Sequence, residues 1–131
     1  MKDTTTTPLS AAVKDKLDLL FNEQRRLIQE IEGTSNKMQD IYKMPEPFVG
    51  YRIFMLSSAM LHEIIELQRE TNWKWWKTSS DISIDRCQEE IIDLWHFLIQ
   101  LSIELGMDAN TIVVKYLEKH KENVKRQKNK Y

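Results

Sequence analysis

The chain has 131 residues and a formal net charge of -1, and 41% of its residues are hydrophobic while 30% are charged. This length suits a single domain over residues 1–131, with enough chain to bury a core and too little for two domains. The composition is typical of a soluble globular protein, and no window resembles a signal peptide or a membrane span, so we expect a cytoplasmic protein with no membrane partner.

The numbers of cysteine, glycine and proline residues indicate the redox compartment and the fold class. The only cysteine, Cys87, can form no internal disulfide, which fits a reducing compartment, and we expect it to be a small core residue. Glycine and proline number three each, and the stretches between them have helical periodicity. The predicted fold class is therefore all-α.

The first predicted helix follows a polar lead, residues 1–8, that we expect to be frayed. Thr7-Pro8 can begin this helix, which should run to about Glu32. Gln24 lies in the middle of its apolar stripe, where a buried amide must be hydrogen-bonded. Its role is either that of a polar layer in the core or that of a residue that reads a ligand.

The next two predicted helices flank a tryptophan-rich loop. Residues 37–47 form a connector that ends in two prolines, which no helix would traverse. The second helix should then cover about Phe48–Thr71 and the third about Ile84–Leu105. Because the third helix is apolar on nearly all sides, we expect it to be central or buried by a second subunit.

A fourth helix follows Gly106, capped by Asp108 or Asn110 and continuing to about Gln127. Short connections imply antiparallel neighbours, and hence a four-helix bundle in which the second and third helices face each other. The apolar third helix predicts a homodimer or a higher homo-oligomer.

Two carboxylate pairs stand in otherwise apolar segments, Glu63 with Glu66 and Glu90 with Asp93. A spacing of three places both members of a pair on one helical face, where like charges repel unless a cation lies between them. Buried and unpaired carboxylates are costly. Four convergent carboxylates predict a divalent-ion site, and ligands that are all oxygen favour Mg²⁺, or Mn²⁺, over zinc.

An alternative is that these carboxylates lie on a solvated face and pair with arginines. Arg69 and Arg86 each lie one helical turn from a carboxylate and would neutralise Glu66 and Glu90. The other member of each pair has no lysine or arginine three or four positions away, which favours the metal site.

The last segment of the chain is basic. Residues 115–131 contain seven lysines and arginines against two glutamates, so the segment carries +5 and the remainder carries -6. A basic helix end can complement its own dipole or lie on a solvated face. Beside a metal cluster it can instead bind phosphates.

Four stretches carry a resemblance that covers most of the chain: Leu20–Leu27, Met60–Leu67 with Trp73–Lys77, Glu89–Phe97, and Tyr116–Lys119 with Asn123, Arg126, Gln127 and Tyr131. They resemble the all-α nucleoside triphosphate pyrophosphohydrolase (MazG-like) superfamily, and its dimeric dUTPase branch in particular. The ExxE and ExxD signature alone is moderately specific. Its combination with the Lys-Trp-Trp-Lys stretch, the Asp-Leu-Trp-His-Phe run and the Lys-x3-Asn-x2-Arg-Gln ending is considerably more so.

The resemblance implies a reaction and a set of site residues. Glu63, Glu66, Glu90 and Asp93 would hold Mg²⁺ ions and carry the catalysis, with Glu63 orienting or deprotonating the attacking water. Cleavage between the α and β phosphates would give a nucleoside monophosphate and pyrophosphate. The positions matched to substrate binding are Gln24, Lys74, Trp76, Lys77, Phe97, Lys119, Asn123, Arg126 and Tyr131.

Individual roles follow from the same resemblance. Lys119, Arg126 and Tyr131 match positions that hold the phosphate chain. Gln24 and Asn123 match nucleoside-binding positions, and each amide can offer the donor and the acceptor that complement a uracil edge.

The aromatic matches have two interpretations. Trp76 and Phe97 match walls of the base and sugar site, where Phe97 would crowd a ribose 2'-hydroxyl, although aromatic residues also simply fill cores. His62 and His96 are interpreted as packing residues or as supports behind the site.

The chain also departs from the family pattern. It is close to the minimal bundle, Ile28 stands where relatives often carry Asp or Asn, and His62 stands where they often carry an acid. These differences leave the metal chemistry intact and weaken the case for strict uracil specificity.

Three function hypotheses remain. The leading one is an Mg²⁺-dependent dUTP diphosphatase whose partner is its nucleotide substrate, with no nucleic acid bound. The second is a broader MazG-like hydrolase of several nucleotides. The third is a non-catalytic helical bundle whose basic tail binds nucleic acid or a protein.

Overall fold

The computed structural model describes residues 15–32 and 48–129 of the chain. This part contains four helices, α2 (Lys16–Glu32), α3 (Phe48–Arg69), α4 (Ile84–Glu104) and α5 (Ala109–Lys128), and no strand. The prediction of an all-α fold with four helices is confirmed. The predicted lead (1–8) and the predicted connector (37–47) lie outside the described residues.

The predicted helix bounds agree with the structure to within one or two residues, except at the start of α2. This helix begins at Lys16, and the predicted start near Pro8 lies outside the described residues. The Asp15 carboxylate accepts hydrogen bonds from the amides of Leu17 at 3.0 Å and Asp18 at 3.2 Å. Asp15 therefore satisfies amide groups of the first turn, as a capping residue does, and the helix begins after it.

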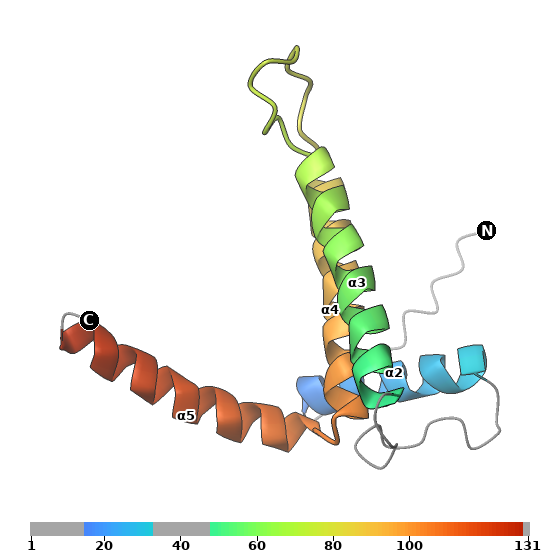
Figure 1. The fold of residues 1–131 in the computed structure, drawn as a ribbon, viewed down its shortest axis with the longest axis vertical. Helices are drawn as coiled ribbons and strands as arrows, with labels where there is room; N and C mark the ends of the chain where they lie inside the picture. The colour runs from blue at the N-terminus through green and yellow to red at the C-terminus, as the bar shows by residue number, and fades with distance from the viewer. Residues whose placement is uncertain (1–14, 33–47, 130–131) are drawn as a thin grey trace, which may run out of the picture.

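α3 and α4 pack side by side as an antiparallel hairpin (Figure 1). At its tip, the Asn72 side chain donates to the carbonyl of Ser80 at 2.8 Å and accepts from the Ser80 amide at 3.1 Å, which closes the connecting loop. At its base, Nε of Arg52 donates to both carboxylate oxygens of the buried Glu104 at 3.0 Å. The hairpin is thus tied at both ends by side chains.

α2 crosses the base of the hairpin and packs against α4 (Figure 1). A small core forms where three helices meet, from the buried Phe21 of α2, Ile99 of α4 and Ala109 of α5. The half-buried Leu17, Ile103 and Ile112 pack around it. α4 therefore contacts α3 on one side and α2 on another, which fits its apolar sequence.

A tight turn ends α4. Gly106 has a φ of 79°, a left-handed conformation that glycine adopts without steric cost. The amide of Gly106 donates to the carbonyl of Ile103, and the amide of Met107 donates to that of Ser102, both at 2.9 Å. This pair of bonds is the Schellman pattern that ends many helices.

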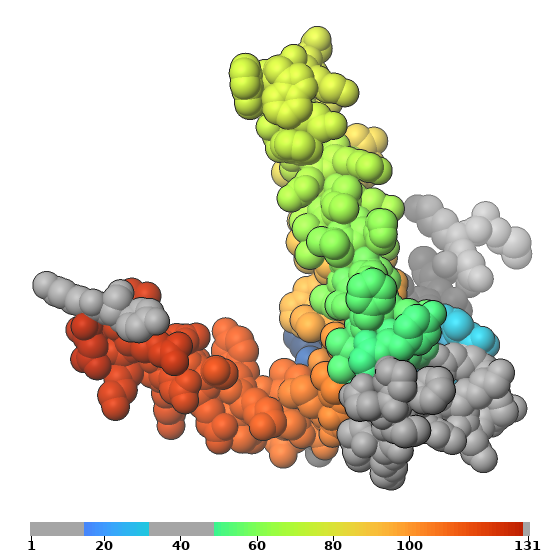
Figure 2. All heavy atoms as spheres, viewed as in Figure 1, coloured from blue at the N-terminus to red at the C-terminus, as the bar shows by residue number. Residues whose placement is uncertain are grey.

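The direction of α5 is set immediately after this turn. The Asp108 carboxylate accepts from the amide of Thr111 at 2.7 Å and so caps α5. Between α4 and α5 the helix axis turns by 100°. Figures 1 and 2 show α5 leaving the hairpin as a separate arm. The expectation that neighbouring helices are antiparallel is therefore wrong for α4 and α5.

Large apolar side chains remain exposed on every helix of the described chain. They include Leu20 and Ile31 of α2, Tyr51 and Phe54 of α3, Ile92 and Trp95 of α4, and Tyr116 and Leu117 of α5. No single helix among residues 15–32 and 48–129 is long and apolar enough to cross a membrane. Oligomerisation, which would cover such surface, stays a prediction.

Candidate functional site

Three of the four predicted carboxylate ligands converge between α3 and α4. Glu63 of α3 and Glu90 and Asp93 of α4 each place one oxygen within 4.8 Å of the others. Glu63 and Glu90 are half-buried, whereas Asp93 is exposed. Ligands on opposite sides of one octahedral Mg²⁺ are about 4 Å apart, so these oxygens are close to the separation that an ion requires.

The buried part of this cluster lacks hydrogen-bonding partners. Oε2 of Glu63 and Oε2 of Glu90 are both buried, and neither has a hydrogen-bond partner among the described residues. Buried acceptors are normally paired, so these two oxygens require a partner that the described part of the chain does not supply. An oxygen-only donor set with two such oxygens fits a divalent cation.

The electrostatics of the cluster agree with this interpretation. Burial raises the pKa of Glu63, and the nearby charges of Glu66 and Asp93 raise it further. Burial likewise raises the pKa of Glu90, with the charge of Glu66 as the next cause. Glu66 is exposed, and its carboxylate lies close enough to act on both groups although it is not among the three that converge. A bound cation would reverse these shifts.

The alternative that arginines neutralise the cluster does not hold for Arg86. Its guanidinium donates to Glu70 at 2.9 Å, not to Glu90. Among the described residues, no ion pair joins Arg69 to Glu66. The cluster therefore has no cation of its own in the described part of the chain.

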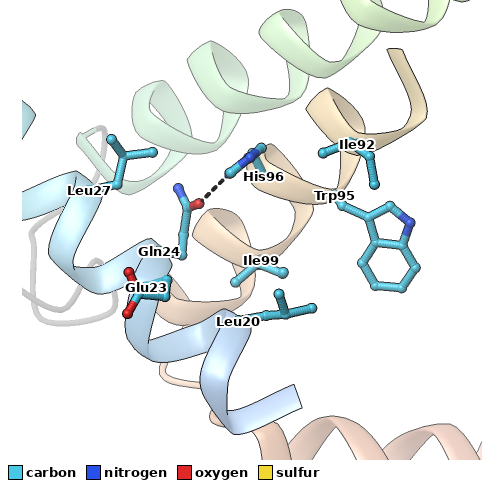
Figure 3. Close-up of a pocket in the computed structure, with 8 residues that line it drawn as sticks. All are labelled: Leu20, Glu23, Gln24, Leu27, Ile92, Trp95, His96 and Ile99. Carbon is cyan, nitrogen blue, oxygen red and sulfur yellow. Dashed lines mark hydrogen bonds between the residues drawn. The ribbon is translucent and has the colours of Figure 1, made fainter. Parts of the chain in front are cut away.

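A second feature is a cavity of about 430 Å³ between α2 and α4, lined mostly by apolar side chains (Figure 3). Its lining consists of Leu20, Glu23, Gln24 and Leu27 from α2 and Ile92, Trp95, His96 and Ile99 from α4. This volume lies within the range of cavities that hold small organic ligands.

Gln24 is the buried polar group of this cavity, with only 5% of its surface exposed. Its Oε1 lies 2.8 Å from Nδ1 of His96 (Figure 3). An amide oxygen only accepts, so the imidazole donates in this contact and the amide NH₂ of Gln24 stays available to a ligand. From the sequence, His96 is interpreted as a packing residue or as a support behind the site, and its contact with Gln24 is not predicted. The spacing of Ile92, His96 and Ile99 was the available signal, because it places His96 on the side of α4 that meets α2.

The two aromatic residues predicted as walls of the base and sugar site, Trp76 and Phe97, do not line this cavity. Phe97 is half-buried and follows Glu90 by seven residues, so it lies on the α3 side of α4 and does not line the cavity. Trp76 is exposed at the tip of the hairpin, edge-to-face with Trp73 and with Trp75 at centroid distances of 5.8 Å. Trp95, for which the sequence predicts no site role, lines the cavity.

Basic residues occupy both extremities of the described structure. Lys74 and Lys77 flank the tryptophans at the tip, with Nζ of Lys74 lying 5.2 Å from the Trp73 ring centroid. Lys119, Asn123 and Arg126 are exposed on α5 and separated from the carboxylates by the bend before this helix. Tyr131 lies outside the described residues.

Comparison with known families gives one match. A family model described as dUTPase matches residues 16–113 of the chain. The chain belongs to this dUTPase family. It is the dimeric, all-α dUTPase branch of the MazG-like superfamily that the sequence resembles. No curated protein and no solved structure matches the chain significantly.

The part matched to the dUTPase family coincides with most of the site. It contains the two carboxylate pairs, the cavity between α2 and α4 (the Gln24 cavity) and the loop with Trp73, Trp75 and Trp76 (the tryptophan loop). The match ends at residue 113, near the start of α5. Because the chain belongs to the dUTPase family, it is a nucleotide hydrolase of the dUTPase type. Lys119, Asn123 and Arg126 lie beyond the match, so their assignment rests on the motifs in the sequence.

Proposed function

We propose that this protein is an Mg²⁺-dependent dUTP diphosphatase that converts dUTP to dUMP and pyrophosphate. The observation that carries the proposal is the pair of buried carboxylate oxygens on Glu63 and Glu90, which have no partner among the described residues and lie beside Asp93. In a member of a dUTPase family, such a cluster is suited to the metal-bound phosphates of a nucleotide.

The residues proposed to hold Mg²⁺, or Mn²⁺, are Glu63, Glu66, Glu90 and Asp93. When bound, the ion neutralises phosphate charge and acidifies water. Glu63 is proposed to orient the attacking water and accept its proton, because its half-buried carboxylate lies in the cluster that would hold the ion. The water oxygen joins the α-phosphorus, and the bond from this phosphorus to the bridging oxygen breaks, so that pyrophosphate leaves with the electron pair.

The Gln24 cavity is proposed to select the base. His96 occupies Oε1 of Gln24, which leaves the amide NH₂ as a donor toward a ligand carbonyl. Uracil has a carbonyl where cytosine has an amino group, so a fixed donor at this position favours uracil. The phosphate chain would be held by Lys119, Arg126 and Tyr131, with Lys74 and Lys77 as further cations and Trp76, Phe97 and Asn123 around the nucleoside.

A broader MazG-like pyrophosphohydrolase is the second candidate, and two observations favour it. Ile28 is buried at 2% exposure, so it serves packing and adds no polar group to the site. The cavity of the single chain also lacks Phe97 and Trp76 in its lining. A site with fewer polar contacts to the base discriminates less between nucleotides.

A panel assay tests the proposal and separates these candidates. Pyrophosphate release is measured with dUTP, dTTP, dCTP and UTP, with Mg²⁺ and with a chelator, and Glu90→Gln serves as the matched inactive variant. A dUTP diphosphatase releases pyrophosphate from dUTP with the highest kcat/KM and only with the metal. A flat profile supports the broader enzyme. Absence of turnover on every nucleotide would overturn both and leave a non-catalytic bundle.

A further inference from the structure

The lysines and arginines of α5 lie on two separate faces of this helix. Lys119 and Arg126, which are proposed to hold the phosphate chain, share one face with Asn123. A second face, called the Lys121 face, is formed by Lys121, Lys125 and Lys128. The centres of the two faces are about 150° apart around the helix, so they point in nearly opposite directions. The proposed function does not use the Lys121 face.

The described part of the chain does not neutralise the Lys121 face. All three of its lysines are exposed, and none forms an ion pair among the described residues. By contrast, Nζ of Lys119 lies 3.9 Å from a carboxylate oxygen of Glu122. The helix dipole favours cations in the last turn, which contains Lys125 and Lys128, but its effect falls off before Lys121. The dipole therefore does not account for the whole face.

The side chains of the Lys121 face surround a hollow of about 320 Å³. Its lining consists of His120, Lys121, Val124, Lys125 and Lys128. Val124 is the only apolar residue of this lining, so the hollow is suited to an anionic group. A helix that binds a lipid surface instead presents bulky apolar side chains to the acyl chains.

An aromatic pair lies beside this hollow. The rings of Tyr116 and His120 are stacked, with centroids 6.2 Å apart and an angle of 7° between their planes. Both side chains are exposed, and His120 also lines the hollow. Proteins bind single-stranded nucleic acids with exposed rings beside cations, because bases stack on the rings while the cations contact the phosphates. In a duplex the bases are already stacked on one another, so this arrangement favours a single strand.

The distribution of charge directs a polyanion to α5. Residues 115–131 carry +5, whereas the rest of the chain carries -6, so a nucleic acid is attracted to this segment and repelled by the remainder. Figures 1 and 2 show α5 leaving the hairpin as a separate arm. From Lys121 to Lys128 the row of lysines spans about 10 Å, which is enough to contact more than one phosphate of the same strand.

We propose that the Lys121 face of α5 binds a single-stranded nucleic acid without sequence preference. Its three lysines contact the phosphates, and a base stacks on the pair formed by Tyr116 and His120. The sequence alone predicted no nucleic acid partner for a dUTP diphosphatase, and the separation of the two basic faces changes this expectation. The inference goes beyond the proposed function and does not depend on it.

Salt-dependent binding tests the role of the lysines. The full chain is titrated to about 100 µM against a fluorescein-labelled DNA strand of about 20 nucleotides, and anisotropy is measured at several salt concentrations. Lys121→Gln/Lys125→Gln/Lys128→Gln should bind about tenfold more weakly at low salt. The slope of log K against log salt should become shallower by about 2, since each phosphate contact contributes about 0.7. No binding by wild type, or equal affinity and slope in both proteins, would overturn the proposal.

A variant with the same loss of charge elsewhere serves as the control. Lys16→Gln/Arg26→Gln/Arg69→Gln removes three exposed cations from α2 and α3 and should bind the strand like wild type. Replacement of the three lysines of the Lys121 face by arginine should also preserve binding, because arginine keeps the charge. An equal loss of affinity in the α2 and α3 variant would show that only net charge matters, and would overturn the assignment to α5.

The aromatic pair is tested at about pH 8, where an ordinary histidine is neutral. Tyr116→Ala/His120→Ala should weaken binding of the single strand about fivefold or more, with the salt slope unchanged because no charge is removed. Binding of a duplex of the same sequence, which offers no free base face, should not change. An equal loss for strand and duplex, or no loss for either, would overturn the proposal of a single-stranded partner.

Anionic vesicles test another partner of a basic helix. Vesicles of phosphatidylcholine with phosphatidylserine are sedimented with wild type and with the triple glutamine variant of the Lys121 face. We expect no sedimentation that depends on these lysines, because their hollow contains a single apolar residue. Binding of wild type to the vesicles but not to the DNA strand would assign the face to a membrane surface and overturn the proposal.

Nucleotide hydrolysis separates this inference from the proposed function. The triple glutamine variant should keep the kcat/KM of wild type, since its face points away from Lys119 and Arg126. A large fall in kcat/KM would place the Lys121 face in the active site and overturn its separate role. If wild type hydrolyses no nucleotide and binds the strand, the proposed function fails and the inference stands. If wild type is active and binds no strand, the inference fails and the proposed function stands.

Discussion

Arg86 donates to Glu70 across the tip of the hairpin, at 2.9 Å, and not to Glu90 one turn along its own helix. This choice of partner has a consequence for the carboxylate cluster. Glu90 keeps a buried oxygen without a hydrogen bond among the described residues, and the cluster stays available to an ion. We therefore expect Glu70 to hold a competing cation away from the cluster.

Glu70→Gln should weaken Mg²⁺ binding, because Arg86 then becomes free to pair with Glu90. We expect the Mg²⁺ concentration for half-maximal activity to rise several-fold to about tenfold, with little change in stability, as exposed ion pairs contribute roughly 0 to 1 kcal/mol. Metal titration by calorimetry and by activity measures the effect. The double variant Glu70→Gln/Arg86→Gln should restore the wild-type midpoint. An unchanged midpoint in Glu70→Gln would show that Arg86 does not compete.

Neutralising the carboxylates should separate activity from stability. Glu63→Gln, Glu66→Gln, Glu90→Gln and Asp93→Asn should each remove most turnover, with a loss of at least about a hundredfold in kcat. Without metal, Glu63→Gln and Glu90→Gln should be as stable as wild type or more stable, since like charges at a half-buried site are removed. Near-normal rates in Glu90→Gln would contradict the assignment of this cluster.

The same cluster predicts a pH dependence. The pKa values of Glu63 and Glu90 are raised in the folded protein, so it binds more protons than the unfolded chain as pH rises above the ordinary carboxyl range of about 4. This contribution to stability is present at low pH and is lost as pH rises through the raised pKa values. Thermal unfolding in a chelator should show the loss in wild type, less of it in Glu63→Gln, and Mg²⁺ should offset it.

The contact between Gln24 and His96 predicts base selectivity. His96→Ala frees the Gln24 amide to rotate, so it no longer presents a fixed donor, and the preference for dUTP over dCTP in kcat/KM should fall by about tenfold to a hundredfold. Gln24→Ala should have a similar effect, and the double variant should add little, because the two residues act as one unit. Phe97→Ala should admit UTP disproportionately. Unchanged selectivity in His96→Ala would remove the cavity from base recognition.

The two hydrogen bonds between the Asn72 side chain and the backbone of Ser80 predict a role for the tryptophan loop. Asn72→Ala removes both hydrogen bonds to Ser80, so the loop with Lys74 and Trp76 should become mobile and KM for the nucleotide should rise several-fold. Limited proteolysis and tryptophan fluorescence report the loop directly. Asn72→Asp keeps the acceptor and loses the donor, so an intermediate effect is expected. Equal kinetics in all three proteins would assign the loop to a role outside catalysis.

The exposed apolar surface predicts association with α4 in the interface. Light scattering at micromolar concentration and moderate salt should give at least twice the chain mass of 15.7 kDa. Leu98→Asp places a charge on the exposed apolar surface of α4 and should shift the equilibrium toward single chains, whereas Gln88→Asp at an exposed polar position should not. A mass of one chain for wild type would contradict this prediction.

Helix positions and the carboxylate pairs were within reach of the sequence. Apolar periodicity and the scarcity of glycine and proline predicted four helices with bounds close to those of α3, α4 and α5. A spacing of three fixes the common face of Glu63 with Glu66 and of Glu90 with Asp93, because this relation depends only on helical geometry. These features depend only on residues close together in the chain, so they can be predicted from a single sequence.

The contacts between helices required the tertiary structure. Gln24 and His96 are 72 positions apart, and nothing local pairs an amide on α2 with an imidazole on α4. In the sequence, Arg86 lies one helical turn before Glu90 and could pair with it. In the structure Arg86 pairs with Glu70 of α3, because the packing of the hairpin brings these two side chains together. The direction of α5 depends on how Ala109 packs with Phe21 and Ile99. Burial of side chains from distant segments sets these relationships, whereas periodicity within one helix specifies only which side of that helix is buried.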